Sequence, residues 1–408
     1  MPRLIFINRF YWPEEPATSQ LLTDLAQGLA TRGHEISVIT SRPNANAAPR
    51  HEYHNGVSIY RIGSSRWGRK SLLGRVADFS SFILGTGAKL LTYPKRGDTV
   101  IFLTDPPLLA ALLWPLLSAR KVSFFHWVQD IYPEIACELT QQRWLKILIP
   151  WRNLSWRRAR HCVTLGKDMR QVLITGRVSS NRSSIISNWP PQGVRPPADP
   201  KDVEQLKLDW KLEGKFIALY SGNLGRVHDL TPIMKAAAEF NAEDNISFVF
   251  IGDGAQADSL REYAASHGLD HVHFHPSQPR ESLNTTLSLG DVHFVSLRSG
   301  CEGFVYPSKL YGIFAVSKPT IFIGPKSSGI AQTIENEQLG ECFTPNDSTG
   351  IAASLRRMTG DLGLRQRYIE NTAKFALTHD FAHALDSWHE LINRERSLAV
   401  NVRPPTLN

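Results

Sequence analysis

The sequence predicts an α/β fold with two doubly wound domains, each a mostly parallel sheet covered by helices. The chain has 408 residues, which is more than one domain usually holds. Short β-rich runs alternate with amphipathic helical segments along most of this length. A proline-rich segment at 188–200 interrupts the alternation, which then starts again.

The first domain is expected at residues 1–188. An apolar run at 4–7 predicts a strand, and the pattern at 18–32 predicts an amphipathic helix that ends at Gly33. Together with a strand at 35–40, these segments make one complete β-α-β unit. Further strands are expected at 99–103, 121–127 and 161–165.

The second domain is expected at residues 189–379, followed later by a flexible tail at 397–408. Five prolines between 188 and 200 remove backbone donors and forbid regular structure, so the domain boundary is placed there. Ligands bind doubly wound sheets just beyond the carboxyl ends of the strands, so we expect a site in a cleft between the two domains. In the second domain we expect strands at 216–220, 247–251, 271–275, 292–296 and 320–323, and helices at 230–240 and 256–267.

The composition excludes several classes of protein. With 42% hydrophobic and 21% charged residues, the chain is not a disordered protein. Its net charge of +8 allows an anionic partner such as phosphate, nucleic acid or lipid headgroups. The four cysteines have no zinc-ligand spacing. The most apolar segment, 108–117, is about half as long as a transmembrane helix, so no membrane span is predicted.

Two glycine-containing loops follow neighbouring expected strands of the second domain. In the first, at 220–226 (YSGNLGR), Gly222 and Gly225 let the backbone approach an anion, and the following helix start offers unpaired N–H groups. A phosphate suits this loop, although an ordinary strand-to-helix turn has the same pattern. In the second, Gly252-Asp253-Gly254, we favour a tight turn over direct chemistry.

The richest segment for chemistry is 300–311 (GCEGFVYPSKLY). Pro307 and Ser308 suit a helix start, which puts Lys309 in the first turn, where a cation is disfavoured unless an anion is bound. This mismatch indicates a phosphate partner. Glu302 lies in a glycine-flanked loop and can accept hydrogen bonds from sugar hydroxyls, but a solvated loop carboxylate explains it as well.

A polar cluster follows a buried strand of the first domain, in the segment 126–134 (HWVQDIYPE). Asp130 and Glu134 can position an acceptor hydroxyl or stabilise a developing positive charge. Two simpler interpretations remain open. An aspartate before a turn proline is often only a turn residue, and His126 in an apolar strand can be a hydrogen-bonded core histidine.

The segment 143–160 (RWLKILIPWRNLSWRRAR) is basic and rich in tryptophan. It has no acidic residue and contains Trp144, Trp151 and Trp156, and its end carries Arg157 and Arg158. Basic side chains beside Trp, Leu and Ile are typical of a helix in a membrane interface. The alternative is a core helix with a solvated basic face. No helix-turn-helix, zinc-finger or RNP pattern occurs, so we expect no nucleic-acid partner.

Taken together, these motifs resemble those of the retaining glycosyltransferases of family 4, which have the GT-B fold. The similarity runs in order over about residues 4–390, through FINRFYWPEEPATSQ, HWVQDIYPE, NWPP, YSGNLGR, FIGDG and EGFVYPSKLYG. The QDIYPE and PSKLYG segments are most similar to enzymes of colanic-acid and O-antigen assembly, including those that transfer fucose or N-acetylfucosamine.

The resemblance implies two Rossmann-like domains that face each other across a deep cleft. A nucleotide-diphosphate sugar of UDP or GDP type would be held mainly by the second domain, and the acceptor by the first. Glu302 matches the first of the family's paired glutamates, and Asp130 or His126 lies where the family places polar groups around the transferred sugar. A final helix at about 380–396 would pack back onto the first domain. The implied donor-binding residues are Gly222, Asn223, Gly225, Arg226, Gly252, Gly254, Ser308 and Lys309.

The implied mechanism has no protein nucleophile. Lys309 and Arg226 would stabilise the leaving diphosphate, which would accept the acceptor's proton on the same face and so retain the anomeric configuration. No metal or other cofactor is expected, since no DxD carboxylate pair occurs. The family's second glutamate falls on Gly312 in this sequence, and its usual lysine after the glycines is replaced by the His228-Asp229 region.

The leading expectation is therefore a cytoplasmic enzyme, attached peripherally to the inner membrane, that extends a polyprenyl-diphosphate-linked glycan of a bacterial surface polysaccharide. Two alternatives have the same architecture. One is a nucleotide-sugar 2-epimerase, which needs catalytic acids around the cleft and no membrane surface. The other is a non-catalytic protein that binds anionic lipid or nucleic acid with a steep salt dependence.

Overall fold

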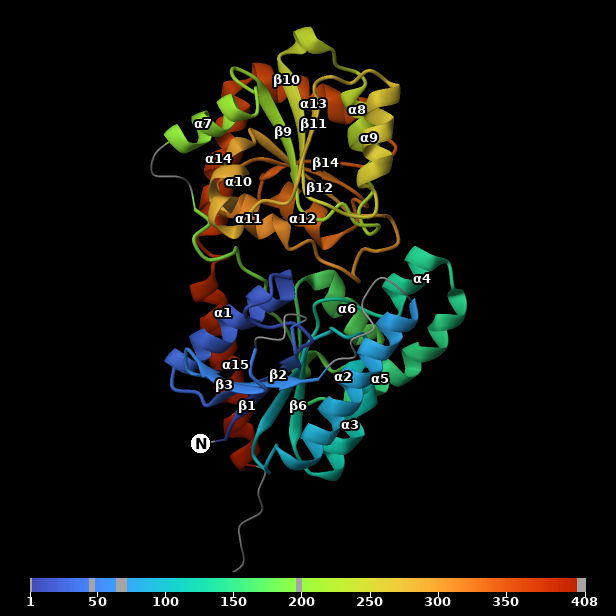
Figure 1. Cartoon of the computed structure of the whole chain (residues 1–408), viewed down its shortest axis with the longest axis vertical. Helices are drawn as coiled ribbons and strands as arrows, with labels where there is room; N and C mark the ends of the chain where they lie inside the picture. Colours follow the sequence, from blue (N-terminus) through green and yellow to red (C-terminus); the bar gives the residue numbers. More distant parts are fainter. Residues whose placement is uncertain (1, 44–47, 64–71, 196–199, 402–408) are drawn as a thin grey trace, which may run out of the picture. The chain divides into compact units, whose positions relative to one another are not determined.

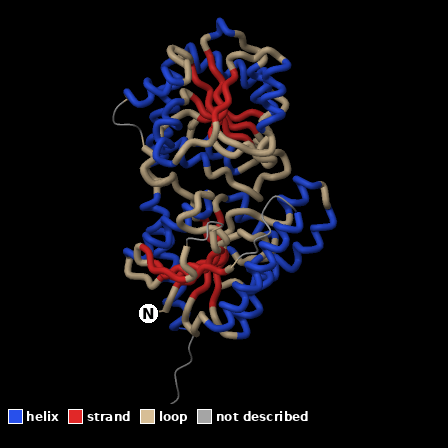
Figure 2. The backbone as a smooth tube through the Cα atoms, viewed as in Figure 1, coloured by secondary structure: helices blue, strands red, loops and turns tan. Residues whose placement is uncertain are grey.

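The structure is a computed structural model that describes residues 2–43, 48–63, 72–195 and 200–401. The first of two compact units comprises the described residues of Met1–Cys137, Gln142–Ser187 and Phe381–Asn408. The second comprises those of Glu138–Gln141 and Asn188–Asp380. In each unit the strands lie inside and the helices outside (Figure 2), which confirms the predicted α/β class with two doubly wound domains.

Among its described residues, the first unit holds an eight-stranded sheet in the order β3-β4-β2-β1-β5-β6-β7-β8. Only the pair β3–β4 is antiparallel. Leu4 of β1 pairs with Ile36 on one side and with Thr99 on the other. The strands are β1 (Leu4–Ile7), β2 (Ile36–Ser41), β3 (His51–His54), β4 (Val57–Ile62), β5 (Thr99–Phe102), β6 (Ser123–Trp127), β7 (His161–Thr164) and β8 (Ser183–Ile185).

Helices cover both faces of this sheet: α1 and α15 lie on one side, and α2, α3 and α5 lie on the other (Figure 1). The apolar residues of α1 recur at helical spacing, so one stripe faces the sheet. None of the described helices has both the length and the apolar composition needed to cross a bilayer. The helices are α1 (Ala17–Thr31), α2 (Leu72–Thr92), α3 (Leu109–Ala119), α4 (Glu134–Thr140), η1 (Arg143–Leu148), α5 (Ile149–Arg158), α6 (Lys167–Thr175), η2 (Ser180–Arg182) and α15 (Phe381–Asn401).

The hairpin of β3 and β4 was not predicted, although its turn carries a clear signal. Asn55 and Gly56 both have positive φ, 47° and 81°, as a two-residue type I′ turn requires. The pair Asn-Gly between two alternating segments is the usual sequence of such turns. The short edge strand β8 was also missed.

The second unit holds, in its described part, a six-stranded parallel sheet in the order β11-β10-β9-β12-β13-β14. Its last strand, β14, was not predicted. The strands are β9 (Phe216–Ser221), β10 (Ile246–Ile251), β11 (Val272–His275), β12 (Val292–Ser296), β13 (Thr320–Ile323) and β14 (Gly340–Phe343). The helices are α7 (Lys201–Asp209), α8 (Thr231–Ala237), η3 (Ala242–Asp244), α9 (Ala257–Ser266), η4 (Arg280–Ser282), α10 (Leu283–Leu289), α11 (Lys309–Ala315), α12 (Gly329–Asn336), α13 (Ser348–Gly360) and α14 (Leu362–Ala376).

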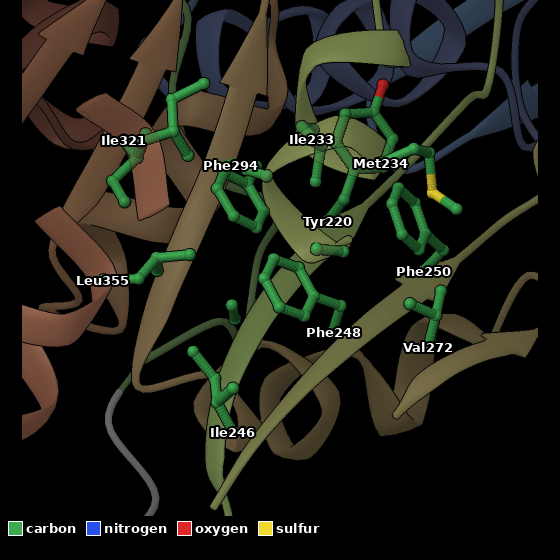
Figure 3. Packing of buried hydrophobic residues seen from close by; sticks show 14 of the residues in the cluster. Tyr220, Ile233, Met234, Ile246, Phe248, Phe250, Val272, Phe294, Ile321 and Leu355 are labelled. Atoms are coloured by element: carbon green, nitrogen blue, oxygen red, sulfur yellow. The ribbon is translucent and has the colours of Figure 1, made fainter. Parts of the chain in front are cut away.

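The core of the second unit is built from the central strands and the helices that cover them. Tyr220, Phe248, Phe250 and Phe294 are almost fully buried and pack against one another (Figure 3). The strands β9, β10 and β12 are covered on both faces, so nearly all of their residues are buried. This packing fixes Tyr220 at the carboxyl end of β9, directly before the first glycine-containing loop.

The C-terminal helix α15 belongs to the first unit. Trp388 is completely buried there, with its ring 5.2 Å from that of Trp127. The predicted flexible tail is wrong for residues 397–401, which continue the helix, because no glycine or proline interrupts the chain before Pro404. The rest of the predicted tail, 402–408, lies outside the described residues.

Candidate functional site

The two glycine-containing loops of the second unit lie side by side because β9 and β10 are neighbours. The Gly222 N–H donates to the Ile251 carbonyl at 2.9 Å, and the Leu224 N–H donates to the Asp253 carbonyl at 2.9 Å. Gly222 and Gly252 have φ of 130° and 136°, and a Cβ on Gly252 would lie 2.2 Å from the Gly222 oxygen. The two loops therefore approach each other so closely that this position must be glycine.

The other residues of these loops are placed less tightly. A Cβ on Gly254 would lie 2.5 Å from the Leu224 carbonyl carbon, whereas one on Gly225 would meet only the Asn223 side chain, at 3.0 Å. Asn223 and Arg226 are exposed. The Tyr220 hydroxyl donates to the Asn223 carbonyl at 2.9 Å, so the buried ring anchors the loop at its first turn.

Lys309 is the first residue of α11 and Ser308 precedes it as the N-cap, so the predicted position of Lys309 in the first turn is confirmed. Its Nζ is buried, lies 3.5 Å from the centroid of the Tyr220 ring, and has no hydrogen-bond partner among the described residues. It also lies 3.2 Å from where a Cβ on Gly222 would be. Burial holds the pKa of Lys309 well below its usual range.

His228 joins this group, although the sequence showed it only as a departure from the family pattern. It is 7% exposed, and its ring lies 6.2 Å from the Tyr220 ring at an angle of 72°. Burial is the main cause that lowers the pKa of His228 to about 3. In the sequence, the only indication of a role for His228 was its position three residues after Gly225, in the loop that leads to α8.

Glu302 is bound within its own turn. Its Oε2 accepts a hydrogen bond from the Gly300 N–H at 2.7 Å, and Gly300 and Gly303 both have positive φ, 88° and 74°. In the loop after β10, Asp253 accepts a hydrogen bond from the Ser277 hydroxyl at 3.1 Å. The role of Glu302 toward a sugar stays a prediction.

The first unit has a small cavity of about 30 Å³ at the carboxyl ends of β5 and β6. One wall is apolar and comes from the start of α3. A cavity of this size holds about one water molecule when polar groups surround it. Its polar lining consists of Thr104, His126, Asp130, Tyr132, Arg152 and Ser155.

Asp130 lines this cavity, and its carboxyl group has a raised pKa. Its backbone N–H donates to the Thr104 hydroxyl at 3.2 Å. Burial, reinforced by the nearby charge of Asp105, raises the pKa of Asp130 to about 7. Asp105 itself is paired with Arg9 at 3.1 Å. Asp130 can therefore gain or lose a proton near neutral pH, as a general acid or base does.

His126 is held as a buried neutral histidine. It is 6% exposed, and its Nε2 lies 2.9 Å from the Ser155 hydroxyl on α5. Burial, with a contribution from the charge of Arg152, lowers the pKa of His126 to about 3. These contacts fit a hydrogen-bonded core histidine that also lines the cavity. Glu134, in turn, is bound by Arg152 through distances of 2.5 and 3.1 Å.

The basic segment forms η1 and α5, and three of its large apolar residues are exposed. Trp144, Ile147 and Trp151 are 67%, 76% and 45% exposed. The assignment of Trp156 to a membrane surface is wrong, because this residue is 4% exposed and the Arg152 guanidinium lies 3.7 Å from the ring centroid. Five residues turn a helix by about 140° beyond a full turn, so Trp151 and Trp156 face different sides.

Within the described ranges, no group of three His, Cys, Asp or Glu side chains is arranged to hold a metal ion. Each unit thus has its own group of candidate residues. In the second unit the group is Lys309, His228, Tyr220 and the glycine-containing loops, and in the first it is Asp130 and the groups around it. The roles assigned to the donor-binding and catalytic residues stay predictions.

Comparison with known proteins links both units to sugar transfer. The family model described as glycosyl transferases group 1 matches residues 202–375, and the glycosyl transferase 4-like domain model matches residues 18–189. The chain is 30% identical over 286 residues to the "Probable glycosyltransferase WbjE" of Pseudomonas aeruginosa, covering 67% of this chain and 68% of that one. It is 24% identical over 368 residues to the "Putative colanic acid biosynthesis glycosyl transferase WcaI" of Escherichia coli K12, covering 85% and 89%.

Solved structures share the whole architecture. HepE of Anabaena in complex with UDP and glucose matches with a TM-score of 0.74 and 14% identity, covering 97% of this chain and 100% of that one. WaaG, a glycosyltransferase involved in lipopolysaccharide biosynthesis, matches with a TM-score of 0.69 and 14% identity, covering 95% and 99%. At these identities, the likeness establishes the fold alone.

Proposed function

The chain belongs to the glycosyl transferases group 1 family, with the GT-B fold, and we propose that it transfers a sugar from a nucleotide-diphosphate donor to a lipid-linked glycan, with retention of configuration. One observation carries the donor half of this proposal. The Lys309 amine is buried beside two glycine-containing loops at the carboxyl edge of the sheet, with no anionic partner in the described part of the chain. A diphosphate would supply the anionic partner that this amine lacks.

The donor is assigned to the second unit. The backbone of Gly222, Gly225, Gly252 and Gly254 lets phosphate oxygens approach, while Asn223, Arg226, Ser308 and Lys309 supply polar contacts. HepE is described in complex with UDP and with UDP-glucose, which supports a nucleotide-sugar donor. A UDP or GDP sugar fits this assignment.

In the proposed reaction the bond between the sugar's anomeric carbon and the diphosphate oxygen breaks, and the acceptor oxygen bonds to the same face of that carbon. The leaving diphosphate takes the acceptor's proton, and Lys309 and Arg226 stabilise its charge. Asp130 and His126 hold the acceptor hydroxyl and the transferred sugar, and Glu302 binds sugar hydroxyls. None of these steps requires a cofactor.

The acceptor class is supported by the named relatives. WcaI is described as a colanic acid enzyme, and WaaG as acting in lipopolysaccharide biosynthesis. We propose a polyprenyl-diphosphate-linked glycan as the acceptor. Fucose or N-acetylfucosamine is the sugar that best fits the QDIYPE and PSKLYG resemblance.

The membrane-facing side is proposed to be the Trp/Arg surface, which we define as Trp144, Ile147, Trp151, Arg157 and Arg158. These residues lie on η1 and α5, and the three apolar ones are exposed. Exposed apolar side chains continue on the neighbouring helices α2 and α3 (Figure 1), at Leu84, Leu91 and Leu112. Such a surface binds anionic lipids by inserting indoles while its cations meet the headgroups. The enzyme would thereby attach to the cytoplasmic face of the inner membrane.

Reversing two charges of the Trp/Arg surface should weaken membrane binding. We expect Arg157→Glu with Arg158→Glu to reduce binding to anionic liposomes by about 1 kcal/mol for each basic residue lost. Sedimentation with phosphatidylglycerol vesicles measures the effect. Tyr53→Ser provides a control, because Tyr53 is 73% exposed on the edge strand β3 of the same unit. Equal sedimentation of the double variant and the wild type would exclude this surface as the membrane site.

The function is tested by nucleotide release from a panel of UDP, GDP, ADP and dTDP sugars, with and without a bacterial polyprenyl-lipid extract. We expect release from one donor that depends on the lipid extract, with the product's anomeric configuration retained. Release without acceptor, accompanied by a changed sugar, would identify an epimerase instead. A folded protein that releases no nucleotide from any donor would contradict the proposal.

A further inference from the structure

The described surroundings of the Lys309 amine hold no negative charge to balance a cation. Lys309 Nζ is buried between the Tyr220 ring and the Gly222 backbone, with no hydrogen-bond partner among the residues described. An isolated ammonium in such surroundings is expensive, because nothing replaces the water that it loses. A neutral amine avoids this desolvation cost, and its N–H can still point at the face of the Tyr220 ring.

The hydrogen bond of His228 fixes the tautomer of its neutral ring. Its Nδ1 lies 2.6 Å from the Ser296 carbonyl oxygen. A carbonyl oxygen can only accept, so Nδ1 carries the hydrogen, and in a neutral ring Nε2 keeps its lone pair. His228 is thus a second base beside Lys309, ready to receive a proton at Nε2.

Two buried titratable groups near this pair are uncharged. The Tyr220 hydroxyl donates to the Asn223 carbonyl, and burial raises the pKa of this phenol. His293 on β12 lies with Nε2 2.9 Å from the Leu287 carbonyl, and burial is the main cause that lowers its pKa to about 3. Burial alone accounts for the lowered pKa of Lys309, without any compensating carboxylate.

We propose that Lys309 and His228 are both uncharged in the free protein, and that binding of a diphosphate brings at least one proton onto this pair. The inference rests on the proposed donor site and adds a regulatory property to it. The proton comes from solvent and adds to Lys309 Nζ or His228 Nε2, and the resulting cation pairs with a phosphate oxygen. Donor affinity therefore depends on pH even though the diphosphate of a nucleotide sugar does not titrate near neutrality.

The direction of this dependence follows from linkage. A base that is neutral in the free protein and protonated in the complex makes binding stronger as pH falls, by about tenfold per pH unit for each proton taken up. The affinity stops changing with pH below the pKa of the base in the free protein, where both states are protonated. It also stops changing above the pKa of the base in the complex, where both states are neutral. We expect donor affinity to fall about tenfold from pH 7 to pH 8.

Calorimetry in two buffers of different ionisation enthalpy counts the protons directly. The probes are UDP-glucose and GDP-mannose, titrated into the full-length protein at pH 7.5. We expect an uptake of about one proton or more with whichever nucleotide sugar binds. His228→Gln should take up fewer protons and show a flatter pH dependence, and Lys309→Met should bind more weakly. His271→Asn is the matched control, because His271 is a buried histidine of the same unit that bonds only the Ala237 carbonyl.

The outcomes separate this inference from the proposed function. Binding with no proton uptake, and with affinity independent of pH, would overturn the proton coupling while leaving the donor site intact. Failure of every nucleotide sugar to bind would contradict the donor site itself. An uptake equally reduced in His228→Gln and in His271→Asn would remove His228 from the pair.

Discussion

Replacing Lys309 by methionine should reduce sugar transfer at least about 100-fold while the protein stays folded. Methionine fills similar space over the Tyr220 ring, but it has no charge to offer a leaving diphosphate. Removing one preorganised electrostatic contact to the developing charge typically costs this much in turnover. The measurement is nucleotide release at saturating donor, together with thermal unfolding.

The same variant should be more stable than the wild type at neutral pH. The pKa of Lys309 is lower in the folded protein than in the unfolded chain, so folding loses free energy at any pH where the unfolded lysine is protonated. This loss disappears when the amine is removed. Lys318→Met is the matched control, because burial also lowers the pKa of Lys318 in the same unit. We expect both variants to gain stability and only Lys309→Met to lose turnover. Full turnover in Lys309→Met would exclude Lys309 from the mechanism.

Asp130→Asn should lower transfer at least about tenfold and raise stability at pH 8. The pKa of Asp130 is raised to about 7, so the folded protein binds a proton there that the unfolded chain has already lost. The contribution of this carboxyl to stability therefore falls as pH rises from about 4 to about 7, and the full penalty persists above that range. Each pKa unit corresponds to about 1.4 kcal/mol, and asparagine removes this penalty.

Chemical denaturation at pH 4 and pH 8 tests this prediction. The variant should gain stability at pH 8 and show little gain at pH 4, where the native carboxyl is already protonated. Glu35→Gln is the control, because Glu35 is an exposed carboxyl of the same unit and should show no gain at either pH. A gain of equal size at both pH values would mean that packing, and not ionisation, explains the effect. Unchanged transfer would remove Asp130 from the catalytic group.

Most elements of the fold were predictable because their signals are local. Alternation of strands and helices indicated both domains, and the strand expected at 4–7 has the same bounds as β1. The hairpin of β3 and β4 was missed even though Asn55-Gly56 marks its turn. β8 and β14 were missed because their sequences, SSI and GECF, contain no continuous apolar run like the LIFI of β1.

The candidate site was predictable only in part. Loops at the carboxyl ends of parallel strands share one edge of the sheet, so the order of strands along the chain is enough to group the glycine-containing segments. The close approach of Gly252 to Gly222 depends on the register in which β9 pairs with β10, and this register cannot be seen in the local sequence pattern. The position of His228 in the chain was known from the sequence. Its proximity to Lys309 depends on how α11 brings Lys309 over the Tyr220 ring at the end of β9.

The sequence by itself determined the class of fold, the boundary near residue 188 and the residues that follow each strand, because these depend on the spacing of neighbouring side chains along the chain. The tertiary structure decided what each side chain meets. It buried Trp156 beneath Arg152, gave Lys309 an aromatic ring instead of an acid, and placed Asp105 near Asp130. Burial and charge arise from segments that are distant in sequence, so the protonation state and the chemistry of these residues follow only once those segments are packed together.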